Sequence, residues 1–168
     1  IVSSCIYFEW GNILCNLLAV ESLIGAKVDR SSVEGIKAAC KRFQVAAGIA
    51  EFILNSVLPH FSRDVHVATH LSKESLEMVK LLMLSQAQSC FYEMAVQQRN
   101  KAGSMKPPVV AKVAAQTAVY FELVAQECHN PSIMKGLEPT WKGAAEFNAA
   151  MFLAAAEYWE AEAAKEAN

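Results

Sequence analysis

Three histidines and one aspartate lie close together in one polar connection of the chain. His60, His66 and His70 are spread over this connection, and Asp64 lies between the first two. Imidazole nitrogens and carboxylate oxygens are zinc ligands, and His66 and His70 would point the same way if the segment were helical. No second pair of ligand-type residues accompanies them at a fixed spacing. We therefore favour a solvated connection that happens to contain histidines, and predict no metal site.

The cysteines do not form the pattern of a disulfide framework or of a zinc module. Their number is odd, and no CxxC pair occurs among them. Each lies in apolar sequence of helical character, so we expect buried free thiols in a reducing compartment rather than nucleophiles. The residues concerned are Cys5, Cys15, Cys40, Cys90 and Cys128.

Catalytic patterns are missing from the rest of the sequence as well. Nucleophilic catalysis needs a serine or cysteine on a strained turn beside a positioned base, whereas the serines here lie at predicted helix starts. Glu157, Glu160 and Glu162 read as one solvated helix face. No glycine-rich nucleotide-binding motif precedes a predicted helix. We therefore predict a protein that is not an enzyme, with no catalytic residues and no cofactor.

The composition indicates a single all-α domain. The chain has 168 residues, 54% of them hydrophobic, with many alanines and few glycines or prolines. A net charge of −2 with dispersed lysines and arginines argues against nucleic-acid binding. No uninterrupted apolar run approaches the roughly 20 residues of a membrane span. We expect membrane association to be peripheral or through partners at most.

Five long helices are predicted, and they imply an antiparallel bundle or a TPR-like α-solenoid. Ser31 and Glu34 suggest a capping box before the second helix, Ser72 caps the third, and Pro107 and Pro108 begin the fourth. The segment 101–106 is read as a loop. The predicted helices cover residues 6–27, 31–58, 72–99, 107–128 and 140–166.

Residues 81–95 form the most apolar part of the third helix, without glycine or proline. Large apolar residues recur there at spacings of three and four, so this helix should lie in the middle of the bundle. We expect Gln86 and Gln88 to be buried amides with partners on neighbouring helices.

Two further packing expectations concern the first two helices. The first helix is apolar nearly all round and should be buried, with Ile6, Ile13 and Val20 extending its core face. Phe52 should face the core from the second helix. Gly48 lies inside that helix, where glycine costs about 1 kcal/mol relative to alanine, so we expect it to permit a close helix contact.

Phe91, Val109 and Val113 form a candidate apolar patch. The two valines are one turn apart on the fourth helix, and Phe91 is on the third. Periodicity alone favours three ordinary core residues. If the two helices are antiparallel neighbours, however, an apolar groove between them would suit an amphipathic helix of a partner protein.

Five stretches, in the same order and at similar spacing, resemble the BRO1 domain family of helical modules. The resemblance runs along nearly the whole chain and covers the middle part of such a domain, so we expect residues 1–168 to be a single, partial BRO1-like domain. The stretches are residues 8–17 (FEWGNILCNL), 34–48 (EGIKAACKRFQVAAG), 82–88 (LMLSQAQ), 109–116 (VVAKVAAQ) and 152–158 (FLAAAEY).

The resemblance implies a function as a protein-binding adaptor. BRO1 domains bind the C-terminal amphipathic helix of ESCRT-III subunits of the Snf7/CHMP4 type, and thereby take part in endosomal sorting, protein transport and membrane scission. The resemblance therefore implies a cytoplasmic, endosome-associated protein. The family's binding patch, a Phe followed by two aliphatic residues on the next helix, falls on Phe91, Val109 and Val113, with Lys112 as a rim contact.

Family members usually carry the larger Ile and Leu where this chain has valines. The connection at 98–106 is also a few residues longer here, so it is expected to lie over or reshape the groove.

An alternative from another class stays open at this point. The chain could be a BRO1-derived scaffold subunit docked into a larger membrane-associated or organellar complex, in a plastid or mitochondrion. Trp141 and Trp159 of the last helix would then serve a fixed interface as exposed aromatic residues.

Overall fold

The computed structural model describes residues 6–61, 69–102, 104–134, 136 and 138–167, and the fold is all-α as predicted. No strand occurs among these residues. The helices are α1 (Ile6–Lys27), α2 (Val33–Phe52), α3 (Lys73–Ala102), α4 (Pro107–Glu127), the short α5 (Pro131–Met134) and α6 (Thr140–Ala167). A π-helical segment (Ile53–Val57) and two 3₁₀ turns (Leu58–His60 and Thr69–Leu71) lie between α2 and α3.

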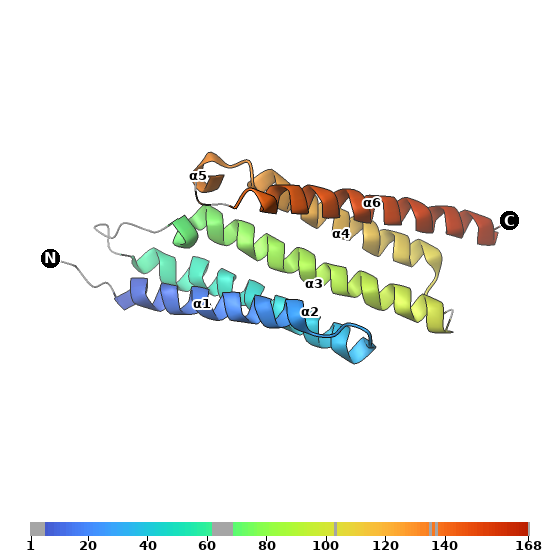
Figure 1. The fold of residues 1–168 in the computed structure, drawn as a ribbon, viewed down its shortest axis with the longest axis horizontal. Helices are drawn as coiled ribbons and strands as arrows, with labels where there is room; N and C mark the ends of the chain where they lie inside the picture. Colours follow the sequence, from blue (N-terminus) through green and yellow to red (C-terminus); the bar gives the residue numbers. More distant parts are fainter. Residues whose placement is uncertain (1–5, 62–68, 103, 135, 137, 168) are drawn as a thin grey trace.

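Helix α3 lies between two helix pairs (Figure 1), with α1 and α2 on one side and α4 and α6 on the other. Its side chains enter the core on both sides. Cys90 and Ala87 pack against α2 residues such as Phe43, while Met78 and Ala95 pack against α4 residues. The prediction that residues 81–95 form the centre of the bundle is therefore confirmed.

Local sequence fixes where the long helices begin. Ser32 caps α2, with its hydroxyl oxygen accepting from the Gly35 N–H at 3.1 Å. Ser31 instead bonds to Asp29, so the predicted capping box beginning at Ser31 does not form. Ser72 Oγ accepts from the Ser75 N–H at 3.2 Å before α3, as predicted.

Helix α1 is an outer helix, contrary to the expectation that it is buried. Its buried residues are Gly11, Leu18 and Gly25, and the residues expected to extend the core face are exposed. Because apolar residues occur on all sides of α1, the sequence pattern does not indicate which side packs against the rest of the bundle. In the structure, the side that contains Gly11 and Gly25 is the packed one. The exposed large residues of α1 are Ile6, Trp10, Ile13, Leu17, Val20, Leu23 and Ile24.

The close glycine contacts occur at positions other than Gly48. A Cβ built on Gly25 would lie 3.0 Å from the Phe43 ring, whereas one on Gly48 would meet nothing within 4 Å. Gly48 is exposed, so the prediction of a close helix contact there is wrong. Phe52, also expected in the core, is exposed and stacks edge-on against Trp10.

By length and composition alone, helix α4 is long and apolar enough to cross a membrane. In the structure 44% of its most apolar window is buried. Its buried side, which includes Val110, Phe121 and Val124, packs against α3 and α6. We therefore assign α4 as a core helix of the bundle.

Candidate partner-binding surface

The four predicted binding residues lie on the neighbouring helices α3 and α4. Phe91 is 42% exposed and Val109 is 44% exposed, so neither is an ordinary core residue. Val113 is half-buried and Lys112 is exposed. The structure thus leaves an aromatic side chain on α3 and a valine on α4 open to solvent.

Residues adjacent in sequence to Phe91 and Val109 join α3 and α4 in one buried cluster. Tyr92 and Ala95, which follow Phe91, pack in one cluster with Val110 and Ala111, which follow Val109. Trp159 of α6 closes this cluster and is only 9% exposed. The expectation of Trp159 as an exposed interface residue is therefore wrong, whereas Trp141 is indeed exposed at 38%.

The connection after Phe91 differs from its prediction. Residues 98–102 continue helix α3, which ends at Ala102 rather than near Arg99. In the remaining connection, Met105 packs onto the cluster of Val96 and Val110. An apolar residue thus anchors the connection to the bundle beside the α3–α4 contact.

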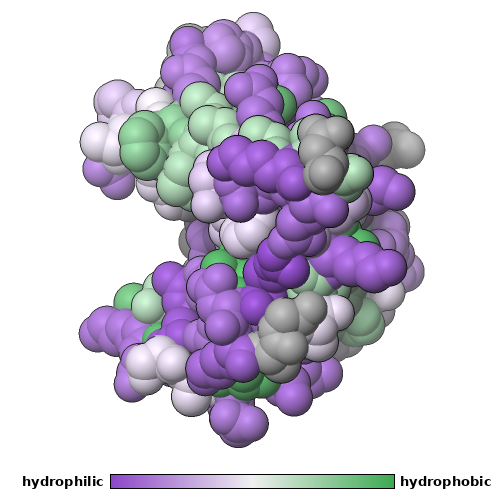
Figure 2. All heavy atoms as spheres, turned by 90° about the vertical axis from the view of Figure 1, so that its right-hand side faces the viewer, coloured by the Kyte–Doolittle hydropathy of each residue, from purple (hydrophilic) through white to green (hydrophobic). Residues whose placement is uncertain are grey.

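A groove of about 570 Å³ lies on another side of α3, between α1 and α6. It hollows the surface between the two halves of the molecule (Figure 2). The α3 residues that line it, among them Leu82, Gln86, Ser89 and Glu93, are offset from Phe91 by about half a turn of helix. Phe91, Val109 and Val113 are not among its lining residues, so the groove and the predicted patch are separate surfaces.

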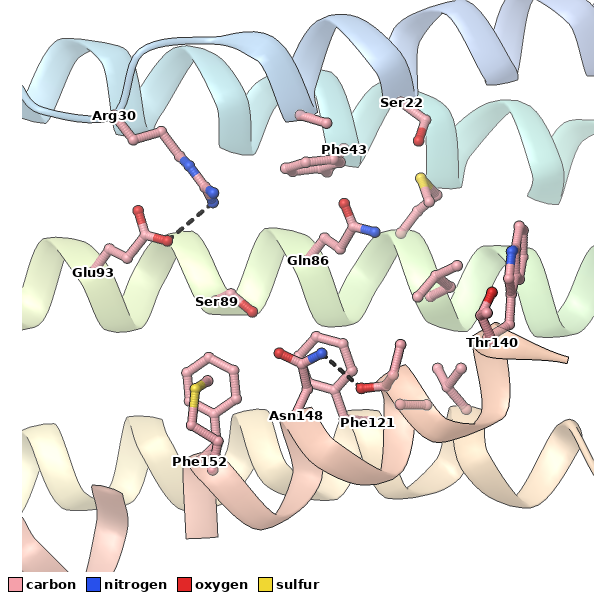
Figure 3. A pocket seen from close by; sticks show the side chains of 18 residues that line it. Ser22, Arg30, Phe43, Gln86, Ser89, Glu93, Phe121, Thr140, Asn148 and Phe152 are labelled. Carbon is pink, nitrogen blue, oxygen red and sulfur yellow. Dashed lines mark hydrogen bonds and ion pairs between the residues drawn. The ribbon is translucent and has the colours of Figure 1, made fainter. Parts of the chain in front are cut away.

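The groove contains an ion pair but no catalytic grouping. Arg30 and Glu93 are the only charged side chains among its described lining residues, and they pair at 3.0 Å (Figure 3). Burial raises the pKa of the Glu93 carboxyl, and the Arg30 charge partly offsets this rise. Asn148 donates to the Ala144 carbonyl at 2.7 Å on the opposite wall.

The two glutamines of the central stretch do not meet the expectation of satisfied buried amides. Gln86 and Gln88 are both only partly buried. Neither side chain makes a hydrogen bond with the part of the chain that the structure describes. Gln86 projects from α3 into the groove, where solvent can reach its amide (Figure 3).

The cysteines have the character of structural thiols. Cys40, Cys90 and Cys128 are buried and Cys15 is half-buried, all four of them free, while Cys5 lies outside the described residues. Burial raises the pKa of the Cys90 thiol to about 11, and the neighbouring Glu93 charge adds to the rise. A thiol with such a pKa is protonated near neutral pH and is a poor nucleophile.

The candidate metal ligands are not gathered within the described residues. His70 Nε2 lies 3.0 Å from Asn12 Oδ1, and the His60 ring stacks on Tyr7. His66 and Asp64 lie outside the described residues. No group of three potential metal ligands was found in the part of the chain that the structure describes.

Comparison with known proteins identifies the family of this helical arrangement. The family model described as the BRO1-like domain matches residues 1–168. The chain belongs to the BRO1-like domain family. This BRO1-like chain also matches a solved structure described as an ALIX BRO1 CHMP4C complex, with a TM-score of 0.85 and 29% identity. That match covers 95% of this chain and 42% of the other.

Curated relatives are much longer than this BRO1-like chain. It is 32% identical over 136 residues to the ALG-2 interacting protein X of Dictyostelium discoideum, covering 81% of this chain and 16% of the relative. It is 32% identical over 140 residues to mouse tyrosine-protein phosphatase non-receptor type 23, covering 82% and 8%. The region shared with that phosphatase is the BRO1-like domain.

Proposed function

We propose that this BRO1-like chain is a protein-binding adaptor that docks an amphipathic helix of an ESCRT-III-type subunit. Phe91, Val109 and Val113 would receive the apolar face of that helix, with Lys112 at the rim. The observation that carries the proposal is the exposure of Phe91 and Val109 on adjacent helices, each next to residues of one shared buried cluster. An adaptor of this kind would act in the cytoplasm, in association with endosomes.

The chemistry of the surface suits a helical ligand. Two aliphatic side chains one turn apart match the spacing at which an amphipathic helix presents its own apolar residues. An exposed aromatic ring on the adjacent helix adds a wide, rigid contact. The solved relative described as an ALIX BRO1 CHMP4C complex supports the same class of ligand for this chain.

An alternative function is a fixed scaffold subunit, which would use the exposed apolar residues of α1 and Trp141 as permanent interfaces. The comparisons give no support to an organellar complex of this kind. The adaptor proposal accounts for the exposed Phe91 and Val109 without requiring a permanent assembly. We therefore keep the adaptor as the proposed function.

A binding measurement with one matched control tests the proposal. A fluorescent peptide of a CHMP4-type C-terminal helix is titrated with the wild type, Val109→Asp and Val119→Asp. Val119 is an exposed valine of α4 that lies about two to three turns beyond Val109. We expect Val109→Asp to weaken binding at least tenfold, about 1.4 kcal/mol, and Val119→Asp to leave it unchanged. Equal affinities of all three proteins would exclude the patch.

A further inference from the structure

The groove between α1 and α6 combines a large apolar inner surface with walls of small side chains. Phe121 and Phe152 line it from within, stacked at a centroid distance of 5.7 Å, and each is 5% exposed. On the walls, α1 contributes Ser22 and Ala26, and α6 contributes Ala144. Because these wall side chains are small, they leave the apolar inner surface accessible to a ligand.

The groove has the length of a short extended peptide. Its α3 residues run from Leu82 to Glu93, which are about 17 Å apart along the helix. Its α6 residues run from Thr140 to Phe152, over a similar distance. A chain in extended conformation rises about 3.3 Å per residue, so about five residues would occupy the groove from end to end.

Two amide side chains in the groove have hydrogen-bonding groups available for a ligand. Gln86 projects from α3 into the groove and makes no hydrogen bond with the part of the chain that the structure describes (Figure 3). Asn148 of α6 donates from Nδ2 to the Ala144 carbonyl, and its Oδ1 can accept a further bond. A helical ligand pairs its backbone N–H and C=O groups internally, whereas an extended segment presents them to its surroundings. The amides therefore favour an extended ligand over a helical one.

The charges of the groove favour an uncharged ligand. Arg30 and Glu93, the charged pair among the described lining residues, lie at one end of the groove, and Thr140 lies at the other (Figure 3). Between these ends the described lining side chains are apolar, or polar and neutral. A charged ligand side chain placed there would lose hydration without gaining a partner. Apolar side chains would instead be buried against Phe121 and Phe152.

We infer that this groove binds an extended, uncharged segment of a partner protein, about five residues long, with apolar side chains at alternate positions. Successive side chains of an extended chain point to opposite faces, so every second one would contact the apolar inner surface. Gln86 and Asn148 would hydrogen-bond to the backbone of the segment. None of the described lining residues belongs to the patch of Phe91, Val109 and Val113, so the chain would bind this segment and a helical partner at separate surfaces.

A peptide selection and a filled-groove variant test this inference. A phage-displayed library of random heptapeptides is selected on the wild-type chain, and the selected peptides are titrated with the wild type, Ala144→Trp and Ala150→Trp. Ala144 and Ala150 are both exposed on α6, but only Ala144 lines the groove. We expect selected peptides with alternating apolar residues to bind Ala144→Trp at least tenfold more weakly than the wild type, and Ala150→Trp as tightly. If no selected peptide distinguishes the two variants, the inference fails.

Recognition of the peptide backbone is tested without filling the groove. Gln86→Ala should weaken binding of a groove peptide about two- to tenfold, the effect of one hydrogen bond. Gln88→Ala is the control, because Gln88 of α3 is not among the lining residues of the groove. N-methylation of the peptide backbone should also weaken binding. If neither Gln86→Ala nor N-methylation changes the affinity, the extended, backbone-bound ligand is excluded.

The two binding surfaces can be distinguished with the same proteins. Val109→Asp should bind the groove peptide like the wild type, and Ala144→Trp should bind a CHMP4-type helix like the wild type. If groove peptides are absent while Val109→Asp still loses the helix, the inference fails and the proposed function stands. If Ala144→Trp loses the helix and Val109→Asp does not, the groove is the site of the helix, and both the inference and the proposed function fail.

Discussion

Trp159 Nε1 donates a hydrogen bond to the Tyr92 hydroxyl at 3.1 Å, and this bond joins α6 to α3 one residue from the exposed Phe91. Tyr92 also meets the Phe152 ring edge-on, at a centroid distance of 5.4 Å. The side chain that follows Phe91 is therefore held by two residues of α6. In this part of α3, Tyr92 therefore packs toward α6 while Phe91 remains exposed.

Tyr92→Phe should destabilise the fold while leaving the patch intact. The change removes the acceptor of the Trp159 N–H, and a largely buried donor without a partner costs about 1–3 kcal/mol. We expect urea unfolding to show a loss in this range. Tyr158→Phe is the control, because Tyr158 is exposed on the same helix as Trp159 and should lose almost nothing. Equal losses in the two variants would contradict the role of the hydrogen bond.

Two glycine-to-alanine changes in α2 should have opposite signs. Gly48→Ala adds a Cβ into open space and should stabilise by about 0.5–1 kcal/mol through helix propensity. Gly35→Ala would drive its Cβ into the Asp29 carbonyl oxygen, so the backbone must shift, at a cost of roughly 1–3 kcal/mol. Thermal or urea denaturation measures both. If Gly35→Ala were more stable than the wild type, the Asp29 carbonyl of the α1–α2 turn could not lie against Gly35 of α2 as the structure has it.

Glu93 should make stability depend on pH. Its folded-state pKa is raised by burial, so the folded protein favours the protonated carboxyl more than the unfolded chain does. Protonated Glu93 therefore stabilises the folded state fully at pH values below the pKa of this carboxyl in the unfolded chain. This contribution is lost as the pH rises through the pKa of Glu93 in the folded protein. Relative to Glu93→Gln, the wild type should lose stability between acidic and neutral pH. Urea unfolding at several pH values gives this difference directly.

Arg30 provides an internal check on that pH dependence. Its charge lowers the pKa of the Glu93 carboxyl and opposes the effect of burial. Arg30→Gln should therefore raise that pKa further and steepen the loss of stability toward neutral pH. The same unfolding series measures the slope. An unchanged slope in Arg30→Gln would mean that the ion pair does not influence the titration of Glu93.

Helix positions could be predicted from the sequence, but the faces of α1 could not. Ser72 and Pro107 mark helix starts by local hydrogen-bonding chemistry, which needs no knowledge of the neighbours. The side of α1 that packs depends on Gly25 lying against Phe43, a long-range contact between small and large side chains. Because apolar residues occur all round α1, the sequence alone does not predict which side of this helix is buried.

The candidate surface was predicted by resemblance, and its exposure required the structure. In the sequence, Phe91 and Tyr92 are adjacent aromatic residues of similar size. The structure distinguishes them because Tyr92 contacts Trp159 of α6, a helix far along the chain.

Enlarging the valines of the patch should strengthen binding of a CHMP4-type helix. Val109→Ile adds one methylene group to a side chain that is 44% exposed. The larger side chain therefore has room to contact a bound helix. A fully buried methylene contributes about 0.8 kcal/mol, which corresponds to an affinity gain of up to about fourfold. Val119→Ile makes the same chemical change at an exposed valine of α4 outside the patch and should have no effect. Isothermal titration calorimetry with the helical peptide measures both variants. A gain of equal size at Val119 would attribute the effect to general hydrophobicity, whereas a gain confined to Val109 would place the ligand over the α3–α4 pair.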